Sequence, residues 1–268
     1  MFSPAFCYYI RMETDQFKVL RMSEDKQFES KAFQLLDQVW EKYLGKAEFV
    51  EQFFGQLYSA YPDLQFLLVD TETDEIAVIG NSFAFKWHGG SDDLPDEGLG
   101  WAASLACGNL KAGKHPNTQV AFQIVVNPGY KGRKMSYRAV EKMIGLGRQR
   151  GFERLLLPLR PSLKESYPLT PMENYVQWRT EDGLPYDPWL RVHLKLGGKL
   201  LGICRRSAVI SGSVATWEEW TGLRFFESGD YILPQGLNPV KIDLNYDRGL
   251  YIEPNVWVVH EFSEESKT

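Results

Sequence analysis

Hydrophobic and polar residues follow one another in patterns that predict both strands and helices. Apolar and basic residues alternate over 17–22, which predicts a strand, and apolar positions three and four residues apart predict helix over 28–60. Two apolar runs joined by the polar turn 71–74 predict a hairpin over 64–87. A short helix is expected over 99–110, so the N-terminal part has the order β, α, α, β, β, α.

The clearest strand lies in the middle of the chain. The run TQVAFQIVV over 118–126 is apolar enough to be buried, and helical spacing then predicts a helix over 136–150 that Gly151 ends. A second buried strand is expected over 154–161. Within it, Pro158 indicates a point where the strand parts from a neighbour, because proline donates no hydrogen bond to a sheet.

The last hundred residues combine two short helices with a β-rich tail. Thr170 and Glu173 predict a capping box, with Pro171 at the first helical position, for a helix that ends near residue 179. Asp187 and the proline after it open another helix, and 199–262 is expected to form strands and turns. No linker interrupts this order. The sequence therefore predicts a single α/β domain over 1–268 with a mixed sheet.

Composition narrows the function classes. The 268 residues include 30 basic and 35 acidic side chains, a net charge of −5, which argues against a general nucleic-acid binder. No apolar run approaches the roughly 20 residues that span a bilayer. No basic segment precedes the short apolar stretch near the N-terminus, so we expect no signal peptide and no membrane partner.

The cysteines and histidines show no metal-binding spacing. Cys7, Cys107 and Cys204 form no CxxC pair, and the four histidines are dispersed. We expect a cytoplasmic protein without a disulfide framework and without a metal cofactor.

Positive charge gathers at the turn that follows the central strand. Residues 131–150 carry seven basic side chains against one acid, Glu141. Backbone N–H groups at a helix start lack intrahelical partners and favour anions, so the strand–turn–helix predicts a diphosphate site. The alternative is a helix with a solvated basic face, which accounts well for Lys142, Arg148 and Arg150 but less well for the basic residues in the turn.

This segment resembles motif A of the GCN5-related N-acetyltransferase (GNAT) superfamily, through Val126 and Pro128 followed by YKGRKMS. The resemblance implies a strand that hydrogen-bonds the pantetheine arm of coenzyme A and a turn that cradles its diphosphate. The residues it assigns to the cofactor are Val125, Val126, Lys131, Gly132, Arg133, Lys134, Met135 and Ser136. Lys134 and Ser136 stand where the family pattern has small residues, which leaves open whether the donor is acetyl-CoA, another acyl-CoA or phosphopantetheine on an acyl carrier protein.

The order of elements also resembles that family over about 17–215, with closing strands over about 255–262. The implied fold is the GNAT fold, a mixed and mostly antiparallel central sheet flanked by helices, here with a β-rich C-terminal extension. A homodimer is possible for such a fold.

His193 falls at a position that carries chemistry in this family. The family ends the corresponding helix in a Tyr-x-x-x-Gly segment whose tyrosine protonates the departing thiolate, and counting back from Gly197 places His193 there. A histidine can give or take a proton near neutral pH, so the resemblance implies a general acid or base. The alternative is a core histidine bonded to a backbone carbonyl.

Ser162 and His193 together resemble the GNAT-like domains of some polyketide synthase loading modules. Those domains pair a histidine with a hydroxyl residue near the strand end, and they decarboxylate malonyl thioesters or move acyl groups onto carrier proteins. Alternatively, Ser162 caps a turn. We expect His88, His115 and His260 to be surface or structural residues.

An aromatic-rich connection over 161–189 offers candidates for the acceptor side. Tyr167, Tyr175, Trp178 and Tyr186 could wall an acyl or acceptor pocket, and Glu173 and Asp182 could bind an amine. Packing of an inserted helical hairpin explains the same aromatics equally well. Trp101 and the segment 253–257 are further candidates for the wall of this cleft.

The expected function is therefore acyl transfer from an acyl-CoA or acyl-carrier-protein thioester to a small-molecule acceptor, an amine above all, with His193 as general acid or base. Two alternatives stay open. One is a malonyl-thioester decarboxylase or acyl-loading enzyme of a polyketide-type pathway, and the other is a non-catalytic module that binds acyl-CoA.

Overall fold

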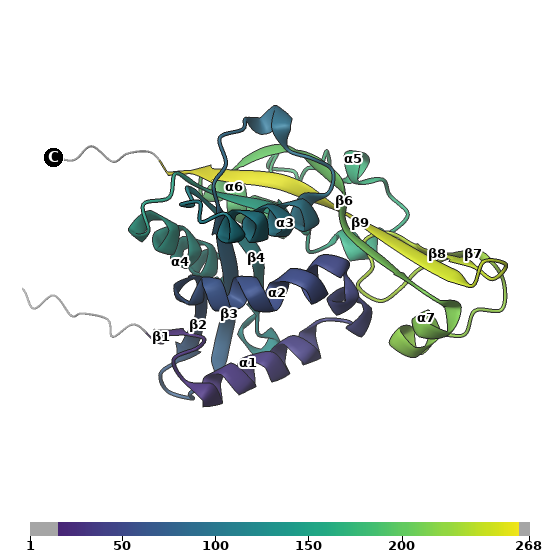
Figure 1. The fold of residues 1–268 in the computed structure, drawn as a ribbon, viewed down its shortest axis with the longest axis horizontal. Helices are drawn as coiled ribbons and strands as arrows, with labels where there is room; N and C mark the ends of the chain where they lie inside the picture. The colour runs from purple at the N-terminus through teal and green to yellow at the C-terminus, as the bar shows by residue number, and fades with distance from the viewer. Residues whose placement is uncertain (1–15, 263–268) are drawn as a thin grey trace, which may run out of the picture.

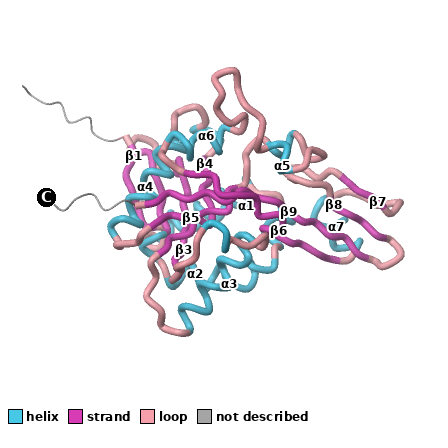
Figure 2. Tube along the Cα trace, turned by 90° about the horizontal axis from the view of Figure 1, so that it is seen from above, coloured by secondary structure: helices cyan, strands magenta, loops and turns pink. Residues whose placement is uncertain are grey.

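Buried apolar runs assemble into one nine-stranded sheet in this computed structural model, which describes residues 16–262 (Figures 1 and 2). The strands are β1 (Phe17–Arg21), β2 (Gln65–Asp70), β3 (Ile76–Phe85), β4 (Thr118–Val126), β5 (Arg154–Leu159), β6 (Lys199–Gly212), β7 (Gly229–Tyr231), β8 (Val240–Asp243) and β9 (Arg248–Glu261). They lie in the order β1-β2-β3-β4-β5-β9-β8-β7, and β6 pairs with the other edge of β9. The tail thus completes the sheet.

The sheet is mixed and mostly antiparallel, as predicted. β4 and β5 are its parallel pair, and every other pairing among the described strands is antiparallel. The long strand β9 joins the two halves of the molecule, because one edge pairs with β5 and the other with β6.

β4 and β5 pair over only a short stretch and then separate. Thr118 lies opposite Arg154, and the last paired residues are Val120 and Leu156. Pro158 follows at the separated edge of β5, while on the opposite edge it still lies in register with Trp257. The prediction that Pro158 marks a parting of strands is confirmed, since the missing N–H falls where no neighbouring strand needs it.

The α-helices cover both faces of the sheet. They are α1 (Lys26–Val39), α2 (Glu48–Ala60), α3 (Gly98–Lys111), α4 (Met135–Gln149), α5 (Met172–Tyr175), α6 (Pro188–Lys195) and α7 (Val214–Thr221). Short 3-10 turns lie at Lys42–Lys46, Pro62–Leu64, Ser91–Asp93, Pro128–Tyr130 and Lys164–Ser166.

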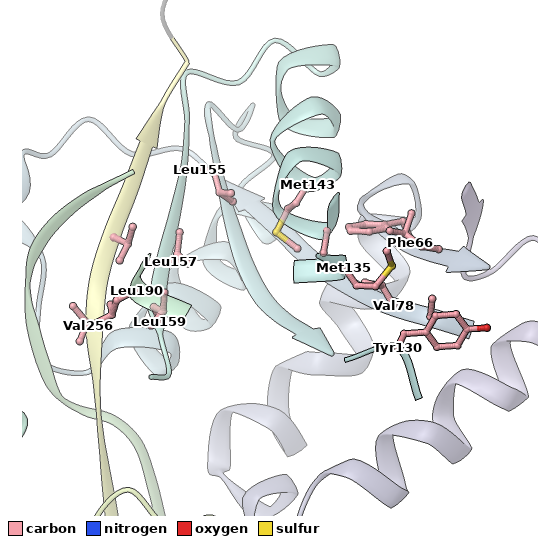
Figure 3. Close-up of a cluster of buried hydrophobic side chains, with 14 of the residues drawn as sticks. Phe66, Val78, Tyr130, Met135, Met143, Leu155, Leu157, Leu159, Leu190 and Val256 are labelled. Atoms are coloured by element: carbon pink, nitrogen blue, oxygen red, sulfur yellow. The ribbon is translucent and has the colours of Figure 1, made fainter. Parts of the chain in front are cut away.

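Alternation along β2 shows how the two faces are filled. Phe66 packs in the cluster that contains α4 and α6, whereas Leu67 packs in the cluster beneath α1. In Figure 3, Met135 and Met143 of α4 lie beside Phe66 and Val78 of the sheet. The sheet is therefore buried on both sides, which holds the ends of β4 and β5 in place.

Three elements differ from the sequence prediction. The helical run expected over 28–60 is broken at Lys42–Lys46, where Tyr43 is buried and donates a hydrogen bond to the carbonyl of Pro234, 2.9 Å away. The break therefore lets Tyr43 join the C-terminal core.

Within the tail, α7 forms where strands and turns were predicted, because Ser213 caps its first turn and the buried Trp217 packs inward. The helix predicted to reach residue 179 is only α5, which Pro171 precedes without any side-chain capping bond. Further along the chain, α7, β7 and β8 form an arm that extends to one side of the molecule (Figure 1).

Candidate active site

A cavity of about 1310 Å³ occupies the region where β4 and β5 separate. Its walls come from the second half of β4, the turn that follows, the end of β5, α6, the end of α1 and the C-terminal strand β9. The predicted site residues that line it are Val126, Lys131, Gly132, Lys134, Met135, Ser136, Ser162 and His193. The fold thus brings the basic turn and His193 to one cavity although they are far apart in sequence.

The turn between β4 and α4 adopts left-handed backbone at two residues. Gly132 has φ 82° and Lys134 has φ 58°. Lys134 takes this conformation at a position where the family pattern has a glycine, and such a φ costs a residue with a Cβ roughly 1–2 kcal/mol. The lysine side chain nevertheless lines the cavity, so the strained position carries a positive charge to the cavity wall.

The backbone of this turn offers free donors. Within residues 16–262, no hydrogen bond is donated by the backbone N–H of Gly132, Lys134, Met135 or Ser136. The side chain of Met135 packs into the core, which fixes the start of α4 (Figure 3). A helix start with free N–H groups and two nearby lysines suits a diphosphate.

Two residues assigned to the cofactor turn away from the cavity. The guanidinium of Arg133 lies over the ring of Tyr130, 5.0 Å from its centroid, and does not line the cavity. The side chain of Val125 is buried beneath α1, on the opposite face from that of Val126, because neighbours on a strand alternate. The structure thus places the side chains of Arg133 and Val125 outside the cavity, and their part in cofactor binding stays a prediction.

Local sequence explains why α6 presents His193. The side chain of Asp187 accepts hydrogen bonds from the backbone N–H groups of Trp189 and Leu190, at 2.9 and 3.1 Å, and Pro188 occupies the first turn. The helix ends before Gly197, which has φ 81°. His193 lies in its last turn, is 1% exposed and borders the cavity.

The imidazole of His193 faces a second histidine. Its Nδ1 lies 2.9 Å from Nε2 of His260 on β9, and the ring of Trp189 stands edge-on at 4.8 Å between centroids. Burial, reinforced by His260, lowers the pKa of His193 to about 3, and burial also lowers the pKa of His260. Both rings are neutral at pH 7, and Nε2 of His193 is buried without a hydrogen-bond partner among residues 16–262.

Ser162 lines the same cavity as His193, and its side chain caps no turn within 16–262. It is exposed, lines the cavity and makes no hydrogen bond to any residue in the described part of the chain. His88 and His115 are exposed, as expected, whereas His260 is buried.

The aromatic residues of the 161–189 connection pack on one another instead of lining the cavity. Tyr167 and Trp178 rings are 4.8 Å apart, and the hydroxyls of Tyr167 and Tyr186 are 2.9 Å apart. Tyr175 is buried and donates to Asp187 at 2.9 Å. The structure places these aromatics outside the cavity, where they support the start of α6, and their role in an acceptor pocket stays a prediction.

Trp101 and the two predicted amine-binding acids are also outside the cavity. Trp101 packs edge-on against Phe85 and Trp257, 5.6 and 6.0 Å between centroids, on the face covered by α3. Glu173 pairs with Arg205 at 3.0 Å on the surface, and Asp182 is exposed. None of the three lines the cavity.

The expected wall at 253–257 is present in part. Glu253 and Asn255 of β9 line the cavity, whereas Trp257, on the same face of the strand, packs against residues of α3 and does not line it. Glu253 accepts from Arg160 at 3.0 Å and from the hydroxyl of Tyr251 at 2.7 Å. Burial alone would lower the pKa of Arg160, but the carboxylate of Glu253 and its neighbours outweigh it, so the guanidinium pKa is raised.

Two searches among the described residues give negative findings. No group of three or more histidine, cysteine or acidic side chains within 16–262 is arranged to hold a metal ion. No helix in the same range is long and apolar enough to cross a membrane. Cys107 and Cys204 are buried free thiols, and Cys7 lies outside the described residues.

Comparison with known proteins decides the family. No protein-family model matches the chain. Over 252 residues, 84% of this chain and 86% of the relative, it is 32% identical to the arginine N-acetyltransferase avaD of Aspergillus versicolor. The chain belongs to the GNAT superfamily. The resemblance of its turn to motif A is thereby confirmed at the level of the family.

One solved structure supports the GNAT fold, and a second shows similarity alone. A GNAT-like decarboxylase, GphF, in complex with isobutyryl-CoA aligns with a TM-score of 0.52 over 91% of this chain and 98% of its own, at 16% identity. The loading GNATL domain of CurA from Lyngbya majuscula aligns with a TM-score of 0.49 at 18% identity, over 69% of this chain and 87% of its own.

Proposed function

We propose that this protein transfers an acetyl group from acetyl-CoA to an amino group of arginine or of a similar small cationic amine. The observation that carries the proposal is the single cavity at the β4–β5 separation, whose wall includes both the basic turn and a neutral histidine. Membership of the GNAT superfamily and the name of the arginine N-acetyltransferase relative support it.

The proposed site for the acyl donor lies mainly on one continuous segment of the chain, from β4 to the start of α4. The diphosphate of coenzyme A would lie at the start of α4, where Lys131, Lys134 and the free backbone N–H groups supply positive potential. The pantetheine arm would follow the separated end of β4, beside Val126, towards α6. A carrier-protein phosphopantetheine has the same arm but lacks the distal diphosphate linkage, so the lysines favour free acyl-CoA as donor.

His193 would move the proton during transfer. The acceptor nitrogen attacks the thioester carbonyl, a C–N bond forms, and the C–S bond to coenzyme A breaks. Nε2 of His193 takes the proton that the nitrogen loses and returns it to the departing sulfur, so the reaction releases amide and free thiol without net proton change. Burial keeps His193 neutral at pH 7 and disfavours the charged ring, so the proton that Nε2 takes up is passed on to the departing sulfur.

Three carboxylates suggest why the acceptor is a cation. Asp37, Glu41 and Glu165 line the cavity, and no ion pair or hydrogen bond among residues 16–262 engages their side chains. A guanidinium offers five donors in a planar fork that matches carboxylates, so an arginine-like acceptor fits this wall.

Mass spectrometry of a reaction panel tests the proposal. Purified protein is incubated with acetyl-CoA or malonyl-CoA, each with L-arginine, L-leucine or no acceptor, and thiol release is measured in parallel. We expect acetylarginine with one thiol released per product from acetyl-CoA, and little product from leucine. Carbon dioxide and acetyl-CoA formed from malonyl-CoA alone would instead indicate the decarboxylase, and tight thioester binding without any product would indicate a non-catalytic module.

A further inference from the structure

His260 stands directly behind His193 in a place where the ring has little freedom. The two rings are 1% and 3% exposed, and 2.9 Å separates Nδ1 of His193 from Nε2 of His260. The histidines are 67 positions apart, one on α6 and the other on β9. The fold therefore builds a buried histidine pair at the cavity wall.

Only one proton can lie between the two facing nitrogens. Burial disfavours charge on both rings, and each neutral imidazole has one donor nitrogen and one acceptor nitrogen. Either His193 donates through Nδ1 and keeps a lone pair at Nε2, or His260 donates and His193 carries its proton at Nε2. The first arrangement makes a base and the second makes a hydrogen-bond donor.

The unpartnered Nε2 of His193 favours the first arrangement. In the second arrangement this atom would carry a buried N–H with no acceptor among residues 16–262, whereas in the first it carries a lone pair. Nε2 of His260 faces Nδ1 of His193, so in the first arrangement it accepts the Nδ1 proton. A neutral ring that accepts through Nε2 carries its own proton on Nδ1.

We propose that His260 is a positioning residue that accepts the Nδ1 proton of His193 and so leaves the Nε2 lone pair of His193 free for the acceptor. This deepens the proposed function and rests on it as far as catalysis is concerned. His260 fills the place of an orienting group, which elsewhere is commonly a carboxylate or carbonyl oxygen. The unpartnered Nε2 of His193 is the atom this arrangement leaves without a protein hydrogen bond.

Neighbouring residues hold the two histidine rings in place. A Cβ at Gly198 would lie 2.8 Å from the carbonyl oxygen of His193 and 2.9 Å from Nε2 of His260, so only glycine leaves room for the two rings. On the other side the ring of Trp189 packs edge-on against His193. The sequence around α6 is thus adapted to the pair as well as to the helix.

Nitrogen NMR of the full chain labelled with ¹⁵N-histidine tests the tautomer without reference to activity. His193→Gln and His260→Gln variants assign the signals. We expect His193 to show a protonated Nδ1 and an unprotonated Nε2 at pH 7. A protonated Nε2 on His193 would overturn the proposal, whether or not the protein proves to transfer acetyl groups.

Two substitutions at position 260 then separate positioning from packing. The amide oxygen of His260→Gln can still accept from Nδ1, whereas His260→Leu fills the space without an acceptor. We expect His260→Gln to keep kcat within about threefold and His260→Leu to lose about 10–100-fold, with the KM for acetyl-CoA within about twofold in both. The exposed His115→Gln serves as a matched control.

Equal losses of kcat in His260→Gln and His260→Leu would overturn the proposal, because they would indicate a packing role alone. If the wild-type protein transfers no acetyl group to any acceptor, the proposed function fails, and the NMR result alone decides whether His260 accepts from His193. The two failures are thus distinguishable.

Discussion

Two parts of the cavity wall, the basic turn over 131–136 and the pair of His193 and His260, are built in opposite ways. The turn is contiguous in sequence, mostly exposed, and presents backbone donors and lysine side chains. The histidine pair joins two distant segments, is buried and carries no charge at pH 7. This difference suits different tasks, since a diphosphate needs positive potential whereas proton transfer needs a neutral, fixed ring.

The two parts also differ in how the surrounding chain holds them. The turn keeps its N–H groups free because a helix starts there, and no residue within 16–262 accepts a hydrogen bond from them. The histidine pair lies between α6 and β9, and the start of α6 is fixed by Asp187 and Tyr175. We therefore expect substitutions in the turn to affect donor binding and substitutions around the pair to affect turnover or stability.

The largest expected effect follows loss of the imidazole at position 193. His193→Ala should lower kcat about 10²–10⁴-fold, the range for removing a general acid or base, while the Kd for acetyl-CoA stays within about threefold. Stopped-flow thiol release and calorimetric titration measure the two quantities. Full turnover in the variant would show that the pair has no part in the chemistry.

Removing the two lysines of the turn should produce the opposite pattern. Lys131→Ala combined with Lys134→Ala should raise the Kd for acetyl-CoA about 10–100-fold, since charge-assisted hydrogen bonds are worth roughly 1.5–3 kcal/mol each and part is retained by the backbone. At saturating donor, kcat should stay within about twofold. Lys142→Ala, on the helix that follows the turn but outside the cavity wall, is the matched control and should leave the Kd unchanged.

Substitutions in the aromatic cluster that supports the start of α6 should lower the stability of the fold. Tyr175→Phe removes a buried hydrogen bond to the Asp187 carboxylate, so the free energy of unfolding should fall by about 2 kcal/mol. Urea denaturation measures the loss. The KM for the acceptor should be unchanged, because Tyr175 is not in the cavity wall. A rise in that KM without loss of stability would restore the aromatic cluster as a substrate pocket.

The free energy of unfolding should fall in acid because the pKa values of the two histidines are lowered in the folded chain. In the folded chain the pKa of His193 is about 3 and that of His260 is also lowered, so both stay neutral while the unfolded chain takes up protons below about pH 6.5. Their contribution to stability is therefore complete above pH 6.5 and is lost as the pH falls towards 3.

The expected slope is up to about 1.4 kcal/mol per pH unit for each histidine. Urea denaturation between pH 7 and pH 4.5 should show it in the wild type. In a variant with His193→Gln and His260→Gln the slope over the same range should be smaller. Identical slopes would mean that the pair titrates normally in the folded chain.

Local pattern was enough to predict the strand, turn and helix over 118–150 that border the cavity. The strand over 118–126, the turn and the helix after it are contiguous, and their hydrophobic periods and basic residues are plain in the sequence. Spacing from Gly197 also pointed to His193, because the helix that carries it is short and clearly bounded. These features depend on neighbours in sequence, which is why they were predictable.

The remaining parts depend on long-range contacts. His260 was expected to be only a surface or structural residue, and nothing near it in sequence indicates a partner 67 positions away. Alternation along β9 places Glu253, Asn255 and Trp257 on one face of the strand, so it gives no sign that the cavity ends before Trp257. The aromatic cluster was ambiguous because pocket walls and packed hairpins share the same composition.

The missed helix α7 has a clear physical reason. Its residues Val214, Thr216 and Trp217 favour strands by type, whereas Ser213 caps a helix and Trp217 and Trp220 lie three apart on one side. Packing of Trp217 into the C-terminal core outweighs the intrinsic preference of the residues around it.

Hydrogen–deuterium exchange with and without saturating acetyl-CoA tests the central claim most directly, in wild type and in His193→Ala together. The account predicts slower exchange in peptides that cover 131–137 in both proteins, because the donor binds at the turn whether or not the chemistry is intact. Unchanged exchange over 131–137 in the wild type, with protection elsewhere, would contradict the account.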